Sequence, residues 1–211
     1  MLKPVYQDNL TTIYQGDCGK IMRQLPNNMV NLINTDPPYL AKDITRCYSI
    51  LADEAYRVMA DNASLTMLVG HFAIEDVILI MSKSRLKWNW IIKMEQPNTH
   101  VRMNLGVEVL WMPILWYVKS QTYLGAWMPD GFTPTGTDGI LKPLHPWQKD
   151  LSWAEFFIKH LTRKGDIILD PFMGSGTTLE AAKRLGRYSV GIDINPQCVE
   201  IAVRRLSNIL C

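Results

Sequence analysis

Short apolar runs typical of β-strands alternate with helix-like runs along most of this chain, and this alternation constrains its fold more than any other feature. Strands that alternate with helices favour a mostly parallel sheet covered by helices on both faces. We therefore expect a doubly wound α/β fold in one domain over residues 1–211. The predicted strands are 11–15, 30–35, 64–69, 88–93, 107–118, 166–169 and 188–192, with a break at Pro113. The predicted helices are 49–60, 73–82, 151–161, 175–185 and 196–206.

Acidic residues come directly after several of the predicted strands. Asp17, Asp36, Asp170 and Asp193 each stand at or just beyond the end of such a run. The carboxyl ends of parallel strands meet at one edge of a sheet, and ligands of doubly wound folds bind there. The four carboxylates are therefore expected to lie close together along one edge.

Composition is that of an ordinary globular protein. The chain has 211 residues, of which 47% are hydrophobic and 20% charged, and its net charge is +2. No basic tail is present, so a nucleic-acid partner would have to be bound by a local patch. The four cysteines lack the spacing of zinc ligands, which predicts reduced thiols and no metal. The most apolar window, 107–118, is much shorter than the roughly 20 residues of a membrane span. With no signal-peptide pattern at the first residues, these features predict a cytoplasmic protein.

A glycine-containing turn follows the predicted strand 166–169. Asp170 ends the strand, the turn contains Gly174 and Gly176, and a helix-like run begins after it. Glycines let a backbone approach a ligand closely, and the N–H groups of a helix start favour an anion. A glycine pair alone also fits an ordinary turn. Asp193 follows the next strand, where a carboxylate can hold ribose hydroxyls, and this placement favours a nucleoside ligand.

The tetrapeptide Asp36-Pro37-Pro38-Tyr39 follows another predicted strand. It fits a simple strand-ending turn, but it also suits a specific reaction. The Asp36 carboxylate and the Pro37 carbonyl can each accept one N–H of a base amine, which turns the nitrogen lone pair toward an electrophilic methyl group. The prolines stiffen the loop, and Tyr39 offers a face on which an extruded base can stack. Asp36 can also stabilise the positive charge that develops on the amine.

Together these segments resemble the DNA amino-methyltransferases of the permuted β-group, in which the catalytic tetrapeptide precedes the cofactor loop. The resemblance covers most of the chain. It implies a Rossmann-like fold with about seven strands, S-adenosylmethionine as the cofactor and double-stranded DNA with a flipped base as the substrate. The matching segments are Gly16-Asp17-Cys18, the tetrapeptide, His145-Pro146-Trp147-Gln148-Lys149, residues 169–178, residues 183–187 and Val190-Gly191-Ile192-Asp193.

The resemblance assigns roles by position. Asp36, Pro37, Pro38 and Tyr39 would bind the target amine and base. The implied cofactor-binding residues are Asp17, Cys18, His145, Gln148, Lys149, Asp170, Phe172, Gly174, Ser175, Gly176, Thr177, Asp193 and Ile194.

The region expected to recognise DNA sequence is short, spanning about residues 120–144, and it is rich in glycine, proline and threonine. Sequence recognition is therefore expected to be relaxed or to be completed by a second copy in a homodimer. Basic residues and one tryptophan of this chain are candidates for DNA contacts. They are Lys42, Lys83, Arg85, Lys87, Arg102 and Trp127.

Transfer to the N6 of adenine in DNA is the expected reaction. The first alternative is N4 methylation of cytosine, for which the family more often has serine where Asp36 stands. The second is an RNA adenine or a protein amide, which Asp36 together with Tyr39 disfavours. The third is a non-catalytic DNA-binding subunit, which the intact motifs disfavour.

Overall fold

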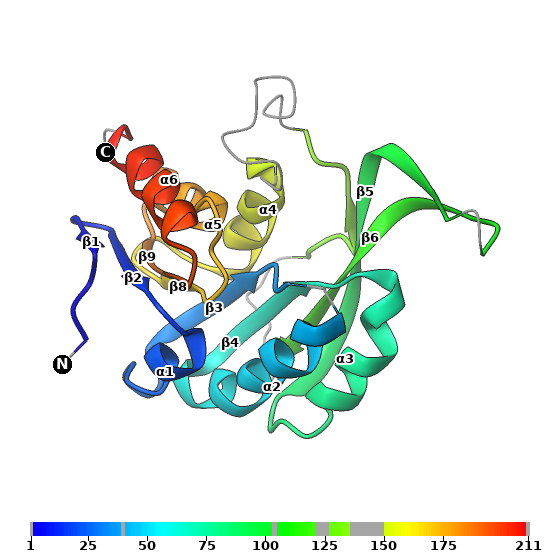
Figure 1. The fold of residues 1–211 in the computed structure, drawn as a ribbon, viewed down its shortest axis with the longest axis horizontal. Helices are drawn as coiled ribbons and strands as arrows, with labels where there is room; N and C mark the ends of the chain where they lie inside the picture. Colours follow the sequence, from blue (N-terminus) through cyan, green and yellow to red (C-terminus); the bar gives the residue numbers. More distant parts are fainter. Residues whose placement is uncertain (1, 39–40, 103–104, 121–126, 136–149, 210–211) are drawn as a thin grey trace.

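One mixed β-sheet forms the centre of the molecule. The structure is a computed structural model, and it describes residues 2–38, 41–102, 105–120, 127–135 and 150–209, except for the side chains of 41–42 and 97–100. Over these residues the sheet has nine strands in the order β1-β2-β9-β8-β3-β4-β6-β5-β7 (Figure 1). In chain order they are β1 (Tyr6–Gln7), β2 (Thr11–Gln15), β3 (Val30–Thr35), β4 (Met59–Leu68), β5 (Lys87–Arg102), β6 (Val107–Val118), β7 (Gly131–Phe132), β8 (Ile167–Asp170) and β9 (Tyr188–Asp193).

The central strands β2, β9, β8, β3 and β4 are parallel to one another, as expected for a doubly wound sheet. The outer part is antiparallel, because β6 pairs with both β4 and β5 in that sense. Two strands of two residues each, β1 and β7, extend the sheet beyond the seven that were expected. The order places β3 beside β8, which is the neighbour relation on which the site depends.

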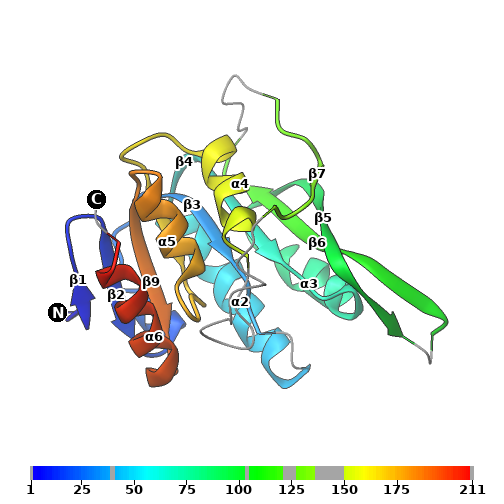
Figure 2. The ribbon, with the colours of Figure 1, turned by 90° about the horizontal axis from the view of Figure 1, so that it is seen from above.

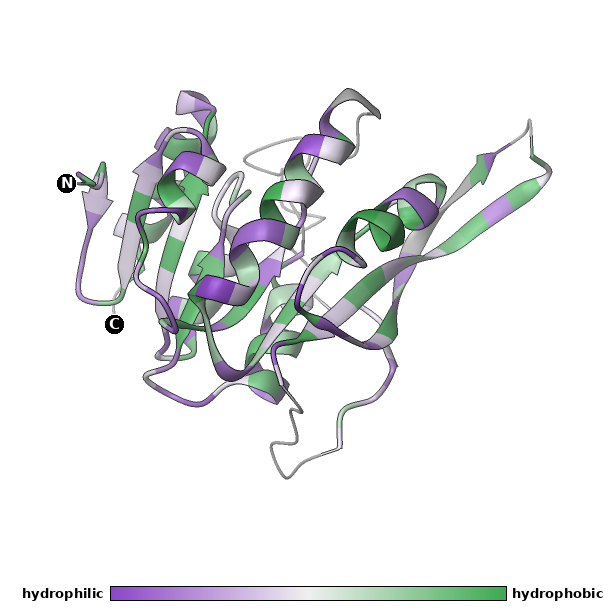
Figure 3. Ribbon diagram, turned by 90° about the horizontal axis from the view of Figure 1, so that it is seen from below, coloured by the Kyte–Doolittle hydropathy of each residue, from purple (hydrophilic) through white to green (hydrophobic). Residues whose placement is uncertain are grey.

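Helices cover both faces of the sheet (Figures 1 and 2). One face carries α1 (Cys18–Met22), α2 (Ala41–Val58), the short helix η1 (His71–Ala73) and α3 (Ile74–Met81). The other face carries α4 (Leu151–Leu161), α5 (Thr177–Arg184) and α6 (Pro196–Ser207). Hydrophilic and hydrophobic residues alternate along most helices, and hydrophobic stretches run along the central strands (Figure 3). The expected doubly wound architecture is therefore confirmed.

Helix α2 begins at Ala41, eight residues before the expected start at position 49. Its first turns contain threonine, cysteine and tyrosine, which are weak helix formers. Burial decides the outcome, because Ile44, Cys47, Tyr48 and Leu51 recur at helical spacing and all face the core. Because of this early start, α2 begins at the second residue after the tetrapeptide.

The strand β6 runs without the break expected at Pro113, which pairs with Lys93 of β5. The carbonyl of Pro113 accepts the N–H of Val69 at 3.0 Å, on the side of β4. In an antiparallel ladder the N–H and C=O of one residue point to the same neighbour. The missing N–H of the proline therefore faces Val69, just beyond Leu68 where β4 ends, so the bond it cannot donate lies outside the β4–β6 ladder.

The β1–β2 turn is fastened to two helices by a buried lysine. The Lys183 ammonium of α5 donates to Asp8 Oδ2 at 2.6 Å and to the Leu206 carbonyl of α6 at 2.9 Å. Burial raises the pKa of Asp8, but the donors around it, Lys183 first, outweigh burial and hold this pKa at about 2. The charged pair therefore belongs to the folded state at neutral pH.

We predict that Asp8→Asn lowers the free energy of unfolding by about 1.5–3 kcal/mol at pH 7, the usual value of a hydrogen bond to a charged group. The folded pKa lies below the unfolded value, so this stabilisation is complete above about pH 4 and disappears as the pH falls toward 2. Urea unfolding of both proteins between pH 2 and pH 7 measures the difference. A difference that stays constant across this range would contradict the assignment.

Candidate active site

A cavity of about 740 Å³ opens at the carboxyl ends of β2, β9, β8 and β3. Asp17, Asp36, Asp170 and Asp193 all line it, which confirms that the four strand-end carboxylates meet at one edge. Other residues expected in the site also line it, namely Cys18, Pro37, Pro38, Phe172, Gly174, Ser175, Thr177 and Ile194.

A buried hydrogen-bond network joins the strand before the tetrapeptide to the strand before the glycine turn. The Thr35 hydroxyl of β3 donates to Asp170 Oδ1 of β8 at 2.7 Å. The next residue inward on β3, Asn34, shares a looser contact with Thr178 of α5, whose hydroxyl donates to the Asn34 carbonyl at 3.4 Å. These contacts set the position of Asp36, the residue after Thr35, relative to the glycine turn.

Among the carboxyl groups that line the cavity, that of Asp170 has the most strongly shifted pKa. Burial raises its pKa to about 7, although hydrogen bonds from Thr35, Thr178 and the Phe172 N–H favour the charged form. The neighbouring Asp36 carboxylate raises this pKa further. Asp170 can therefore gain or lose a proton near neutral pH, and a cation in the cavity would favour its charged form.

The glycine turn is held in place from two sides. The Gly174 N–H donates to Asp193 Oδ2 at 2.9 Å, which ties the turn to the end of β9. From α6, Arg205 donates through Nη1 to Thr177 Oγ1 at 3.0 Å, and its guanidinium forms an ion pair with the buried Glu180. The start of α5 is thus fixed before any ligand arrives.

Gly176 has a structural role that differs from the expected one. It caps α5 with φ +82°, a left-handed conformation that favours glycine. A Cβ at this position would lie 3.0 Å from the Cβ of Ala202 in α6. Gly176 does not appear among the residues that line the cavity, so it shapes the turn and lets α6 pack closely.

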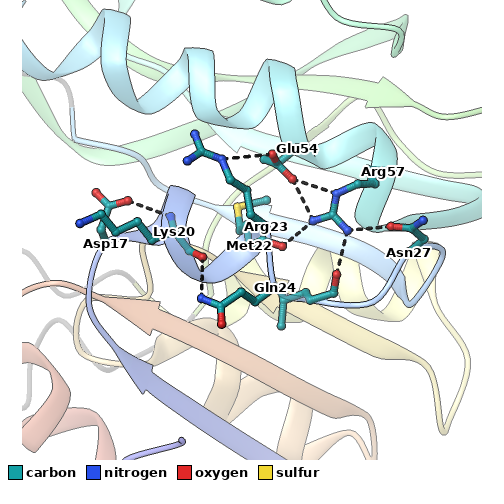
Figure 4. Close-up of polar contacts among 9 residues, drawn as sticks. Asp17, Lys20, Met22, Arg23, Gln24, Asn27, Glu54 and Arg57 are labelled. Atoms are coloured by element: carbon teal, nitrogen blue, oxygen red, sulfur yellow. Dashed lines mark hydrogen bonds and ion pairs between the residues drawn. The ribbon is translucent and has the colours of Figure 1, made fainter. Parts of the chain in front are cut away.

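Asp17 begins the helix α1 and faces the cavity. Its Oδ1 accepts the Lys20 N–H at 2.9 Å, and its carboxylate forms an ion pair with Arg46 of α2. Figure 4 shows how this region is anchored: Arg57 of α2 donates to the carbonyl of Met22, the last residue of α1, at 2.5 Å. The contact holds α1, and with it Asp17, against α2.

The site has a wall that the sequence analysis missed. Asp43, Arg46, Cys47 and Ile50 of α2 line the cavity. Their spacing of three, four and seven residues is that of one helix face, so an earlier start for the helix would have revealed them. Phe72 and Trp153 also line the cavity without having been expected.

The thiols at the cavity behave as apolar surface. Burial raises the pKa of Cys18 to about 12, with the nearby Asp17 carboxylate adding to the shift. Burial also raises the pKa of Cys47. Both groups stay protonated at neutral pH and suit a flat, uncharged ligand.

Several expected site residues lie outside the described residues: Tyr39, His145, Gln148 and Lys149. Lys42 lies in the first turn of α2, but its side chain is not described. Arg102 is exposed at the end of β5, and Trp127 is 89% exposed.

The basic cluster Lys83, Arg85 and Lys87 is not brought to the cavity. Lys87 pairs with Val118, which also pairs with Ser64 in β4, well before the carboxyl end of that strand. The cluster therefore lies toward the opposite end of the strands from the cavity. The Arg85 guanidinium lies 4.0 Å from the centre of the Tyr56 ring, so this side chain already packs against the protein.

Comparison with known proteins gives consistent matches. A family model described as DNA methylase matches residues 125–204. The type II methyltransferase M2.MboI of Moraxella bovis is 26% identical over 254 residues, covering 99% of this chain and 92% of that protein. M2.DpnII of Streptococcus pneumoniae is 45% identical over 84 residues, which cover 39% of this chain. The putative methylase YubD of Escherichia coli K12 is 26% identical and covers 94% of this chain.

Solved structures agree with the sequence matches. The M1.HpyAVI complex with S-adenosylmethionine superposes with a TM-score of 0.75 at 25% identity, covering 95% of this chain and all of the other. Together these matches support a member of the N6-adenine/N4-cytosine DNA methylase family. The cytosine-N4-specific PvuII DNA methyltransferase shares the fold, with a TM-score of 0.81 at 17% identity over the whole chain.

This methylase uses S-adenosylmethionine, and DNA is the substrate of its family. The cavity suits such a cofactor, because a sulfonium and an ammonium are positive and the described lining carries several carboxylates. The N-terminus of α5, whose first residue Thr177 lines the cavity, suits the cofactor's carboxylate.

Two features are absent from the described part of the chain. No cluster of three or more His, Cys, Asp or Glu residues there could hold a metal ion. No helix within it is both long and apolar enough to cross a membrane.

We predict that the affinity of this methylase for S-adenosylmethionine falls as the pH is lowered through 7. Protonation of Asp170 removes a negative charge that faces a cationic ligand, and its pKa of about 7 sets the midpoint. The expected loss approaches about tenfold per pH unit below that midpoint. Isothermal titration calorimetry between pH 6 and pH 8.5 gives the profile.

Thr35→Val provides a matched control for this pH profile. It keeps the side-chain volume but removes the hydrogen bond that favours ionised Asp170. The midpoint should therefore move to higher pH, and Asp170→Asn should flatten the profile. An affinity that does not change with pH in the unmodified protein would refute the role given to Asp170.

Proposed function

We propose that this methylase transfers a methyl group to the exocyclic N6 of adenine in DNA. The observation that carries the proposal is that Asp36 and the glycine turn line one cavity. The cavity volume of about 740 Å³ is at the larger end of the range for ligand sites, which leaves room for a base beside a cofactor.

Asp36 and Pro37 are proposed to hold the target amine. Asp36 is partly buried and Pro37 is buried, so both acceptors lie in a partly dehydrated site where hydrogen bonds to a base are strong. The Asp36 carboxylate and the Pro37 carbonyl each accept one N–H, which directs the nitrogen lone pair away from the ring. The carboxylate then stabilises the positive charge that the amine acquires and can take up the released proton.

The cofactor is proposed to lie along the opposite side of the cavity, on β2, β9 and β8. When bound, S-adenosylmethionine supplies an electrophilic methyl group on a sulfonium. Asp17 would contact its adenine and Asp193 its ribose, while Asp170, Phe172, Gly174, Ser175 and Thr177 would line its methionyl part. Cys18, Ile194, His145, Gln148 and Lys149 complete the proposed set, with Gly176 acting through the shape of the turn.

DNA is proposed to reach the site with the target base flipped out of the double helix, because a base inside a duplex cannot enter a cavity. Lys42, Arg102 and Trp127 remain candidates for contacts with DNA, and Tyr39 for contact with the base. The half-exposed tryptophans Trp88 and Trp90 on β5 support a proposed homodimer.

Product analysis tests the choice of base. The purified protein, plasmid DNA and S-adenosylmethionine are incubated, and the DNA is digested to nucleosides for mass spectrometry. N6-methyladenine is expected, and N4-methylcytosine as the sole product would replace the proposal with the cytosine reaction. An RNA substrate tested in parallel addresses the remaining nucleic-acid alternative.

We predict that Asp36→Ala lowers kcat by at least about 10²–10³-fold, the usual cost of losing one group that stabilises developing charge. The affinity for S-adenosylmethionine should largely survive, because Asp36 acts on the amine. Single-turnover methylation and calorimetry separate the two quantities. Normal turnover by this variant would remove Asp36 from the proposed role.

A further inference from the structure

Phe72 is an exposed aromatic residue on the rim of the same cavity. It lies in η1, the short helix that follows β4 after two residues, and 61% of its surface is exposed. Single exposed apolar residues are common on proteins, so exposure alone says little. Its position at the mouth of a cavity that also contains Asp36 requires a more specific explanation.

The strand order places Phe72 on one particular side of Asp36. The strands run β2-β9-β8-β3-β4, and the site residues at or beyond their carboxyl ends are Asp17, Asp193, Asp170, Asp36 and Phe72 respectively. The residues proposed to bind the cofactor follow the first three strands. Asp36 stands between that group and Phe72, so Phe72 borders the part of the cavity that lies beyond the reacting amine.

The Phe72 ring lies close to the backbone of Gly70. Gly70 has φ −66° and ψ 138°, an extended conformation open to any residue, so its backbone does not require glycine. A Cβ at Gly70 would lie 2.8 Å from one ring carbon of Phe72 and 3.3 Å from another. The absence of a side chain at position 70 is what allows the ring to occupy its place.

The turn that carries Phe72 is also anchored on both sides. The His71 ring packs edge-on against Trp111 of β6, with ring centres 5.0 Å apart. The Ala73 N–H donates to the Gly70 carbonyl at 2.8 Å, and the Ala73 side chain is buried. An exposed ring on an anchored turn offers a preformed flat surface.

We infer that Phe72 is the stacking platform for the extruded base on the β4 side of the site, with Gly70 holding the ring in position. The inference rests on the proposed function. Stacking on an aromatic face accepts any base, so Phe72 positions the target and leaves the choice of base to Asp36 and Pro37.

The test compares Phe72→Ala, Phe72→Trp and Gly70→Ala with the unmodified protein. Steady-state methylation of plasmid DNA gives kcat/KM for DNA, and calorimetry gives the affinity for S-adenosylmethionine. Phe72→Ala should lower kcat/KM for DNA by about 5- to 150-fold, the range that loss of one base–aromatic stack produces. Phe72→Trp should restore most of the activity, and cofactor affinity should stay unchanged in both.

Gly70→Ala keeps the ring but displaces it, so it should lower kcat/KM for DNA in the same direction as Phe72→Ala. Leu79→Ala is the matched control, because Leu79 is 59% exposed on α3 and does not line the cavity. Its kinetics should equal those of the unmodified protein, and thermal unfolding verifies that every variant is folded.

Three results would overturn the inference: unchanged kinetics in Phe72→Ala, an equal loss of cofactor affinity, or no rescue by Phe72→Trp. A protein whose unmodified form gives no methylated adenine would instead contradict the proposed function. The two failures are therefore distinguishable in the same set of assays.

Discussion

The hydrogen bond from Thr35 to Asp170 joins two parts of the active site that lie 135 residues apart in the chain. Thr35 ends the strand that leads to Asp36, and Asp170 ends the strand that leads to the glycine turn. The parallel pairing of β3 with β8, through Leu32 with Ile168 and Ile33 with Leu169, sets the register of the two segments. Without this pairing the tetrapeptide and the glycine turn would have no common edge.

The cavity concentrates negative charge before any ligand binds. Five aspartates line its described surface, and Arg46, paired with Asp17, is the one arginine or lysine among those lining residues. Crowding and burial make ionisation unfavourable, which the raised pKa of Asp170 reflects. A cationic cofactor offsets this cost, and the same charges oppose an anionic ligand. The negative charge of the cavity therefore favours binding of a positively charged ligand such as S-adenosylmethionine.

The architecture could be predicted, because the hydrophobic periods of two and 3.6 residues that mark strands and helices are local signals. The meeting of the four aspartates could be predicted too, because each stands at the end of a recognisable strand. Strand β3 and helix α4 have the expected bounds, 30–35 and 151–161. The early start of α2 was missed because burial of Ile44 and Tyr48 overrides weak helix propensity, and the cavity wall on α2 was missed with it.

Other errors came from interactions that no single segment reveals. The continuity of β6 through Pro113 depends on where β4 ends. The cluster at Lys83, Arg85 and Lys87 was assigned to DNA from charge alone; the antiparallel pairing places it away from the cavity, and its contact with DNA stays a prediction. Phe72 belongs to no sequence motif. The closeness of its ring to the Gly70 backbone is apparent only in the folded structure.

The central claim is that the two motifs form one reaction site across the β3–β8 pair. A crystal structure of the protein with bound S-adenosylmethionine tests it most directly. The account predicts that the sulfonium methyl points toward Asp36, with a gap between them that one amino group fills. A cofactor bound elsewhere, or one whose methyl group points away from Asp36, would contradict it.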